Sequence, residues 1–167
     1  MASASHIVPA SRIAPASLSA RAVQAVVEPG QGIQAAIEAA PEQSSVPYVI
    51  LIKKGTYNEK VIVDRPNIGL LGEHRDSTRL IFAELSSKRT IREYKGKPVG
   101  NGVIVLQEGA DDCIIGTMTV YNNYGSTVEP TTAHQMAIFG RATRTIVIDC
   151  CVWADGNDAL ALWAPEG

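Results

Sequence analysis

The sequence predicts an all-β fold, namely a right-handed single-stranded parallel β-helix with a short helix covering its N-terminal end. Most of the chain consists of short β-rich runs separated by Gly, Asn, Asp and Pro. Several runs are apolar at consecutive positions and two-residue hairpin turns are scarce, which favours covered parallel strands over an antiparallel sandwich. A Gly, a polar turn and a strand also recur at 109–120 and 140–152, starting 31 residues apart as in coil-like repeats.

Residues 1–27 are expected to form a disordered or processed tail. They contain no Asp or Glu, are rich in Ala and Ser, and carry Arg12 and Arg21. Pro9 and Pro15, together with Arg12, interrupt the apolar run that a secretory signal would need. We therefore expect one partial β-helix domain over residues 28–167.

The first regular element is a helix over 32–40, closed by Pro41. Its apolar residues have the i, i+3, i+4, i+7 spacing of one helix face: Ile33, Ala36, Ile37 and Ala40. This helix is the expected N-terminal cap, since an uncovered coil would expose unpaired backbone groups along its edge.

The β-rich runs follow the helix, and nothing after it looks helical. No second cap follows the last run, so the C-terminal part of the β-helix is expected to be missing. The runs are Tyr48 to Ile52, Val61 to Val63, Ile68 to Leu71, Arg79 to Phe82, Val103 to Leu106, Ile114 to Val120, Met136 to Phe139, Thr145 to Trp153 and Ala159 to Trp163.

Composition limits the classes of partner. With 167 residues, 46% of them hydrophobic, the chain can bury the core of one domain. The net charge of −2 gives no electrostatic reason to expect nucleic acid or an anionic membrane as a partner, and the apolar runs are too short to span a bilayer. Cys113, Cys150 and Cys151 form neither a metal-binding pair nor an even disulfide framework, although a bridge from Cys113 to one of the others stays open.

The candidate chemical groups are amides and carboxylates, because the sequence lacks G-x-S-x-G, H-E-x-x-H and P-loop motifs. If Met136 and Ile138 point inward, Gln135 lies on the outer face. Asn157 and Asp158 stand at a turn one coil later, and coils stacked at about 4.8 Å would bring these groups into one shallow groove. The alternative is that Asn157 and Asp158 are only turn formers, and the side on which Asp158 projects stays open.

Several segments together resemble the pectinesterases (pectin methylesterases), in the order of that family. The family's H-Q-A-V-A-L block is resembled at His134 to Ala137 and its C-R-I-D-G-Y-Q-D-T-L block at Cys151 to Leu160, and the spacing between the two blocks needs no gap. The segments are Gly30 to Val63, Leu70 to Glu73, Met118 to Asn123, His134 to Ala137 and Cys151 to Leu160.

The resemblance implies a pectin-lyase-like parallel β-helix that hydrolyses methyl esters of galacturonate units in pectin, without a metal or another cofactor. It assigns Asp158 as the general acid/base and Gln135 as an oxyanion-hole amide, with Asn157 in the place of the second glutamine. Amides suit that task because they donate hydrogen bonds without a charge that titrates. Thr119, Tyr121 and Trp153 are candidate substrate-binding residues, with core packing or turn covering as the alternative for the aromatic side chains.

Two departures from the family pattern concern the site. Asn157 is shorter than glutamine by one methylene, and Gly156 replaces the family's tyrosine. No residue matches the family's nucleophilic aspartate or its arginine, both of which lie downstream of the Q-D-T-L position in the family. The 167-residue chain alone is therefore expected to be inactive.

The resemblance also implies pectin or polygalacturonate as partner, a secreted, periplasmic or cell-wall location, and a monomer when full length. The basic segment 86–97 is either a polygalacturonate-attracting loop or a solvated insertion. Two other functions stay open, another pectin-active β-helix enzyme (a lyase or polygalacturonase) and a non-catalytic polysaccharide-binding β-helix. Asp111 and Asp112 are the only adjacent acidic pair for a calcium-dependent lyase, and turn chemistry explains them.

Overall fold

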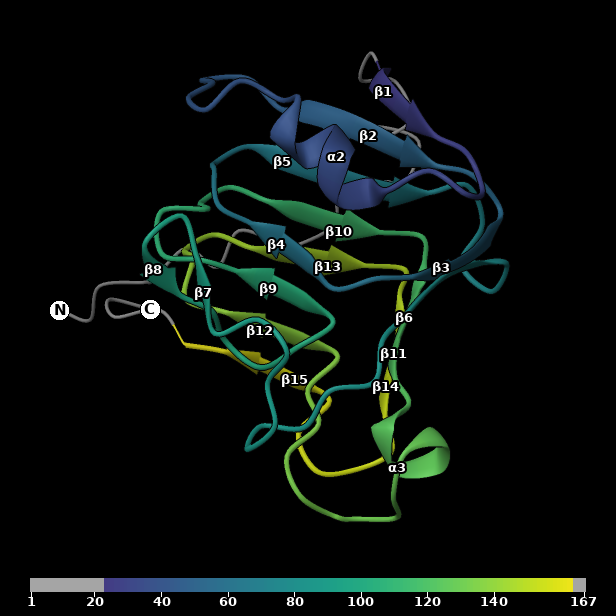
Figure 1. Cartoon of the computed structure of the whole chain (residues 1–167). Helices are drawn as coiled ribbons and strands as arrows, with labels where there is room; N and C mark the ends of the chain where they lie inside the picture. Colours follow the sequence, from purple (N-terminus) through teal and green to yellow (C-terminus); the bar gives the residue numbers. More distant parts are fainter. Residues whose placement is uncertain (1–22, 164–167) are drawn as a thin grey trace, which may run out of the picture.

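Three parallel sheets form the body of the molecule in a computed structural model that describes residues 23–163 (Figure 1). Sheet A has the order β1 (Val23–Val27), β2 (Tyr48–Ile52), β5 (Ile68–Gly72), β10 (Ile114–Gly116), β13 (Ile146–Ile148). Sheet B has the order β14 (Cys151–Ala154), β11 (Thr119–Asn122), β6 (Thr78–Ile81), β3 (Gly55–Asn58). Sheet C has the order β15 (Leu160–Leu162), β12 (Ile138–Gly140), β9 (Ile104–Leu106), β4 (Val61–Val63).

The chain visits the three sheets in turn, so each circuit A to B to C is one coil of a parallel β-helix. Equivalent strands of the last two coils pair in register, with Ile114 opposite Ile146 and Thr119 opposite Cys151. This confirms the expected parallel β-helix, and it explains the repeated pattern at 109–120 and 140–152 as two stacked coils.

Two expected strands are each split into two by a sharp corner. The run 114–120 is broken at Thr117, with φ 54°, and the run 145–153 is broken at Asp149, with φ 50°. A residue at positive φ cannot continue an extended strand, so the chain turns there from sheet A into sheet B. The prediction of single strands was therefore wrong at both places.

The N-terminal boundary also differs from the expectation. β1 begins at Val23, and its residues pair with β2, with Val27 opposite Ile52 and almost fully buried. Residues 23–27 therefore belong to sheet A, because a composition without acidic residues does not prevent an apolar segment from pairing. The rest of the expected tail lies outside the described residues.

The predicted capping helix is present as α2 (Ile33–Glu38), which packs against β1, β2 and β4 (Figure 1). Ile33 and Ile37 are fully buried. The Glu59 carboxylate accepts hydrogen bonds from the backbone N–H groups of Ile33, at 2.7 Å, and Gln34, at 3.2 Å. A side chain from the loop after β3 therefore satisfies donors that the helix itself leaves unpaired.

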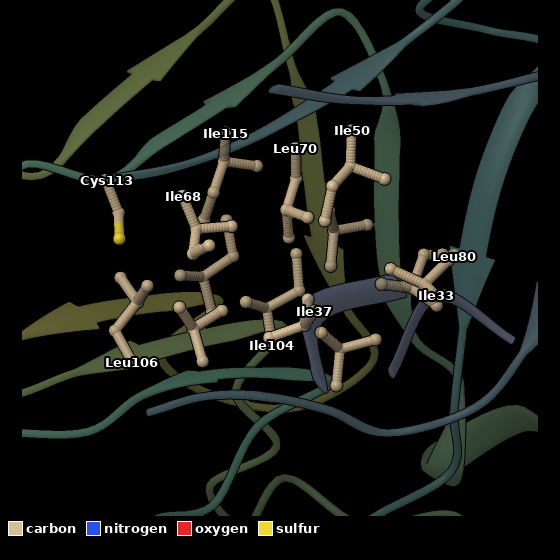
Figure 2. Close-up of a cluster of buried hydrophobic side chains, with 14 of the residues drawn as sticks. Ile33, Ile37, Ile50, Ile68, Leu70, Leu80, Ile104, Leu106, Cys113 and Ile115 are labelled. Carbon is tan, nitrogen blue, oxygen red and sulfur yellow. The ribbon is translucent and has the colours of Figure 1, made fainter. Parts of the chain in front are cut away.

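The interior between the sheets is filled mainly by aliphatic side chains that point toward one another (Figure 2). Each fully buried Ile or Leu contributes on the order of 1.5–3 kcal/mol relative to an exposed one. A second cluster lies on the opposite, outer face of sheet C, since successive side chains of a strand alternate between faces. It consists of Ile62, Val99, Val105, Met136 and Phe139.

The segment between β6 and β9 covers this outer cluster. It contains the antiparallel hairpin of β7 (Glu93–Tyr94) and β8 (Lys97–Pro98), beside sheet C in Figure 1. A buried ion pair between Lys60 and Glu84 anchors its start, and Glu84 also accepts hydrogen bonds from Gly102 and Thr90. Burial lowers the pKa of Lys60, and the hydrogen bond and charge of Glu84 oppose part of that effect.

The three cysteines are all free. Cys113 is buried in the core, Cys150 is half-buried beside it, and Cys151 is exposed at the start of β14. The bridge that the sequence left open is therefore absent among these residues.

Candidate functional site

The candidate site is the turn from Asp155 to Ala159 that connects β14 to β15. Asp158 adopts φ 61°, a left-handed conformation that Asp tolerates better than most residues. Its side chain is 51% exposed, and its Oδ2 lies 2.5 Å from Nδ1 of His134. The side chain of Asp158, whose direction the sequence left open, therefore projects from the surface toward the neighbouring coil.

The backbone fixes the alignment of the two coils at this point. His134 pairs with Asn157 in an isolated parallel bridge, and the Gln135 N–H donates to the Asn157 carbonyl at 3.2 Å. Asn157 and Asp158 are both exposed. The stack therefore places one amide, one carboxylate and one imidazole on the same stretch of surface.

Gln135 does not reach this surface. Its side chain has no solvent exposure, its Oε1 accepts from the backbone N–H of Gly125 at 3.0 Å, and its Nε2 donates to the Thr131 carbonyl at 3.0 Å. The expectation that Gln135 lies on the outer face, with Met136 and Ile138 inward, was wrong for Gln135 and for Met136, which belongs to the outer cluster. Ala137 and Ile138 are both in the core and both donate to the Ala159 carbonyl, so alternation is broken here.

Two glycines allow the burial of Gln135. A Cβ at Gly156 would lie 2.2 Å from the Ala133 carbonyl oxygen and 2.7 Å from Gln135 Nε2. A Cβ at Gly125, in α3 (Tyr124–Thr127), would lie 2.7 Å from Cβ of Asp155. Gly156 is therefore a packing requirement of this turn, and a tyrosine there would displace the segment that covers Gln135.

The candidate substrate-binding residues lie on sheet B. Tyr121 and Trp153 are neighbours in register on β11 and β14, and Trp153 is 59% exposed. Thr119, opposite Cys151, donates its hydroxyl to the Arg75 carbonyl at 2.9 Å. The structure thus brings Thr119, Tyr121 and Trp153 together on two adjacent strands.

Asp155 links this aromatic surface to the turn, and the sequence reasoning missed it. Its carboxylate accepts from the Tyr121 hydroxyl at 2.7 Å and from the Ser126 N–H at 2.8 Å. Burial alone would raise the pKa of Asp155, but the hydrogen bonds from Tyr121 and Ser126 outweigh it and lower that pKa below its usual value. In the sequence, Asp155 stands out only because it precedes Gly156. An Asp-Gly pair is typical of any turn, so it does not point to a site.

His134 is the second residue that the sequence reasoning did not assign. The stacking of β12 on β15 places it beside Asp158. The signal was its position immediately before Gln135, which was itself expected opposite the Asn157–Asp158 turn.

Residues 23–163 contain neither a metal-binding cluster nor a membrane-spanning helix. No group of three or more His, Cys, Asp or Glu residues in that range is arranged to hold a metal ion. Neither of the helices described there is long and apolar enough to cross a membrane.

Similarity to known proteins extends over most of the described chain. The profile of the pectinesterase family matches residues 25–161. Probable pectinesterase 30 of Arabidopsis thaliana is 39% identical over 90 residues, which are 51% of this chain and 17% of that protein. Pectinesterase A of Dickeya dadantii is 33% identical over 89 residues, which are 53% of this chain and 24% of that protein.

Solved structures have the same fold. Pectin methylesterase from carrot superposes with a TM-score of 0.61 at 24% identity, covering 78% of this chain and 39% of that one. A pectin methylesterase in complex with a hexasaccharide gives a TM-score of 0.55 at 23% identity, covering 75% and 43%. The chain spans less than half the length of each of these relatives. With the family profile matched over residues 25–161, the chain belongs to the pectinesterase family.

Proposed function

We propose that this chain supplies part of a pectinesterase site that hydrolyses methyl esters of galacturonate units in pectin. The observation that carries the proposal is the exposed Asp158 carboxylate on the β14–β15 turn, 2.5 Å from His134 on the neighbouring coil, in a chain of this family. A partly exposed carboxylate that a neighbouring side chain holds in place suits general acid/base transfer to and from an ester oxygen.

The roles of the other residues follow from their positions. Asn157 is exposed beside Asp158 and is the amide best placed to donate to a developing oxyanion. Gln135, with both ends of its amide engaged by backbone groups, is assigned to positioning the segment 125–133 rather than to contacting the substrate. Tyr121 and Trp153 offer an aromatic surface for sugar rings, one coil apart on sheet B.

The expected partner is methylated pectin, and the expected place of action is where pectin lies, in a secreted, periplasmic or cell-wall setting. One relative of known structure is described as bound to a hexasaccharide, which supports an oligosaccharide as ligand. None of these 167 residues matches the family's nucleophilic aspartate, which would work together with Asp158. We therefore expect them, taken alone, to bind the substrate without turning it over.

A methanol-release assay on highly methylated pectin, combined with titration of a methylated hexagalacturonate, tests the proposal. We expect no methanol from the 167-residue polypeptide, but saturable binding that Asp158→Asn and Trp153→Ala weaken. Asp149→Asn, an equally exposed carboxylate change at a corner of the same coil, is the matched control and should leave binding unchanged.

Three outcomes would count against parts of the proposal. Turnover that Asp158→Asn abolishes would show that another group replaces the nucleophile. Absence of binding to the methylated oligosaccharide would refute the substrate class. Equal binding of methylated and unmethylated oligosaccharides, unaffected at Asp158, would favour a polysaccharide-binding role without ester chemistry.

A further inference from the structure

A second polar site lies on the outer face of sheet C, away from Asp158. Its centre is Gln107, which directly follows β9 and is only 3% exposed. Neither the Nε2 nor the Oε1 of Gln107 has a hydrogen-bond partner, and no other described residue leaves both ends of a buried amide unpaired. Since an unpaired buried amide costs free energy, this side chain is placed to bind something from outside the chain.

The backbone holds Gln107 firmly in this position. Its N–H donates to the Val63 carbonyl at 2.9 Å, and its carbonyl accepts from Ala110 at 3.0 Å. Alternation along β9 places Gln107 on the same outer face as Val105. The amide is therefore held in place by strand pairing and does not belong to a mobile loop.

A hollow of about 480 Å³ opens beside Gln107, within the range of small-molecule sites. Its apolar wall is formed by Val105, Pro98 and the ring of Phe139. A smaller hollow of about 230 Å³, lined by Asp64 and Arg65, adjoins it, and the Gln107 side chain lines both.

Two cations and one carboxylate border the larger hollow. These are Lys97 on β8, Arg141 after β12, and the exposed Glu108. Neither Lys97 nor Arg141 takes part in an ion pair with another described residue, although most of the other lysines and arginines in residues 23–163 do. The Arg141 guanidinium lies 6.0 Å from the centre of the Phe139 ring, so its planar donors are held over an aromatic face.

These groups define the chemistry of the ligand. A guanidinium fork pairs with a carboxylate, an amide with free donor and acceptor pairs with hydroxyl groups, and an aromatic ring packs against the apolar face of a sugar ring. We propose that the hollow binds one acidic sugar unit, with its carboxylate on Arg141 and Lys97 and its hydroxyl groups on Gln107. The choice of galacturonate among acidic sugars rests on the proposed function.

This site is separate from the Asp158 turn. Arg141 lies three residues after Ile138, while Asp158 lies two residues before Leu160, the partner of Ile138. Five residues along the strand direction correspond to roughly 15 Å. The acidic-sugar site therefore binds a ligand carboxylate, which is the product of ester hydrolysis, at the opposite end of the strands of sheet C.

The test is an NMR titration of the 167-residue chain with galacturonate at low salt, following the side-chain amide of Gln107. We expect a saturable shift, and at least about tenfold weaker binding for Arg141→Ala, because a charge-assisted contact is lost. Arg92→Ala removes the same charge from the segment between β6 and β9, which also carries Lys97, at a position that does not line the hollow, and it should leave the affinity unchanged. Galactose, which lacks the carboxylate, should bind at least about tenfold more weakly.

Gln107→Leu gives a second, independent readout. It should abolish the galacturonate-induced shifts of the backbone amides around the hollow, which replace the Gln107 side chain as reporter in this variant. It should also raise the melting temperature of the unliganded chain, because an apolar side chain replaces an unpaired buried amide. A lower melting temperature with unchanged binding would overturn the proposal, as would the absence of any saturable shift. Equal binding of inorganic phosphate would overturn the sugar assignment.

The result is distinguishable from a failure of the proposed function. Asp158→Asn should leave galacturonate binding at Gln107 intact, whatever its effect on methylated oligosaccharides. Galacturonate binding that disappears in Asp158→Asn but survives in Arg141→Ala would move the ligand to the Asp158 turn and refute the second site.

Discussion

Cys113 illustrates how the core changes the chemistry of one side chain. Burial raises the pKa of its thiol from 9.0 to about 11, because the thiolate would have to exist among aliphatic side chains. Cys151, which the corner at Asp149 turns outward, is exposed instead. The two residues should therefore differ both in reactivity and in their effect on stability.

The raised pKa of Cys113 predicts a loss of stability at alkaline pH. Between pH 9 and 11 the unfolded chain releases this proton while the folded chain keeps it, so the free energy of unfolding falls as the pH rises. The loss attributable to Cys113 is on the order of 2–3 kcal/mol. Urea unfolding at successive pH values measures it, and Cys113→Ala should flatten the slope whereas Cys151→Ala should keep it. Identical slopes in the two variants would contradict the prediction.

At this scale the sequence predicted which residues come together better than it predicted their exposure. Gln135 does meet the 157–158 turn through its backbone, as stacking of the coils required. Its burial depends on Gly125 and Gly156, which leave room for the preceding segment 125–133 to fold back over it. Strand alternation carries no information about such a covering segment, so Gln135 was expected outside.

The corners between sheets A and B are the elements that determine the cross-section of the β-helix. Asp149 suits its corner, because Asp tolerates the left-handed region, whereas Thr117 is β-branched and is strained at φ 54°. The two residues occupy equivalent corners of stacked coils, since β10 pairs with β13 and β11 with β14. One coil therefore has a residue suited to the corner and the other does not.

Replacing Thr117 with Asn should stabilise the protein by roughly 1 kcal/mol, because it removes strain at a position that must keep its conformation. Thermal unfolding should show a rise of about 2–4 °C. Thr119→Asn, two residues on and inside β11, is the control and should give no gain, since Asn is disfavoured in strands. A fall in melting temperature for Thr117→Asn would show that the threonine makes a compensating contact.

The sequence located strands well where apolar runs end at clear turn residues. The bounds of β2 and β4 match the predicted runs 48–52 and 61–63. It failed where one apolar run turns a corner. No Gly or Pro stands at Asp149, and Gly116 is the last residue of β10, so the positive φ falls on the β-branched Thr117 that follows it. The basic segment 86–97 stays either a polygalacturonate-attracting loop or a solvated insertion, and two of its lysines, Lys88 and Lys95, are paired with Glu129 and Asp64.

For the whole molecule, the two ends of the stack differ. α2 packs over the coil that contains β1, β2 and β4, whereas β13, β14 and β15 each pair on one side only among the described residues. Ile146, Leu160 and Leu162 are each roughly 40% exposed on those strands. An open row of strand edges with apolar side chains is a template for pairing with another chain.

These 167 residues, made as one polypeptide, should therefore associate in a concentration-dependent way. Sedimentation velocity over a range of concentrations measures this. Leu162→Lys should reduce the association, because a charged residue on an edge strand opposes edge-to-edge pairing. Val46→Lys, at an exposed apolar position away from the edge strands, is the control. A single monomeric species at every concentration would contradict the prediction.

The stacking of coils also sets the order in which the molecule should open. Within each sheet, a strand pairs only with the strands of the neighbouring coils. Unfolding should therefore begin at an end of the stack and proceed coil by coil, rather than in one step for the whole core. Backbone amides of β13 to β15 should exchange with solvent first and those of β2 and β5 last, because the latter are held on both sides. The Asp158 turn lies in the part that opens earliest, so ligand binding there would report on the fraying of one coil while most of the protein stays folded.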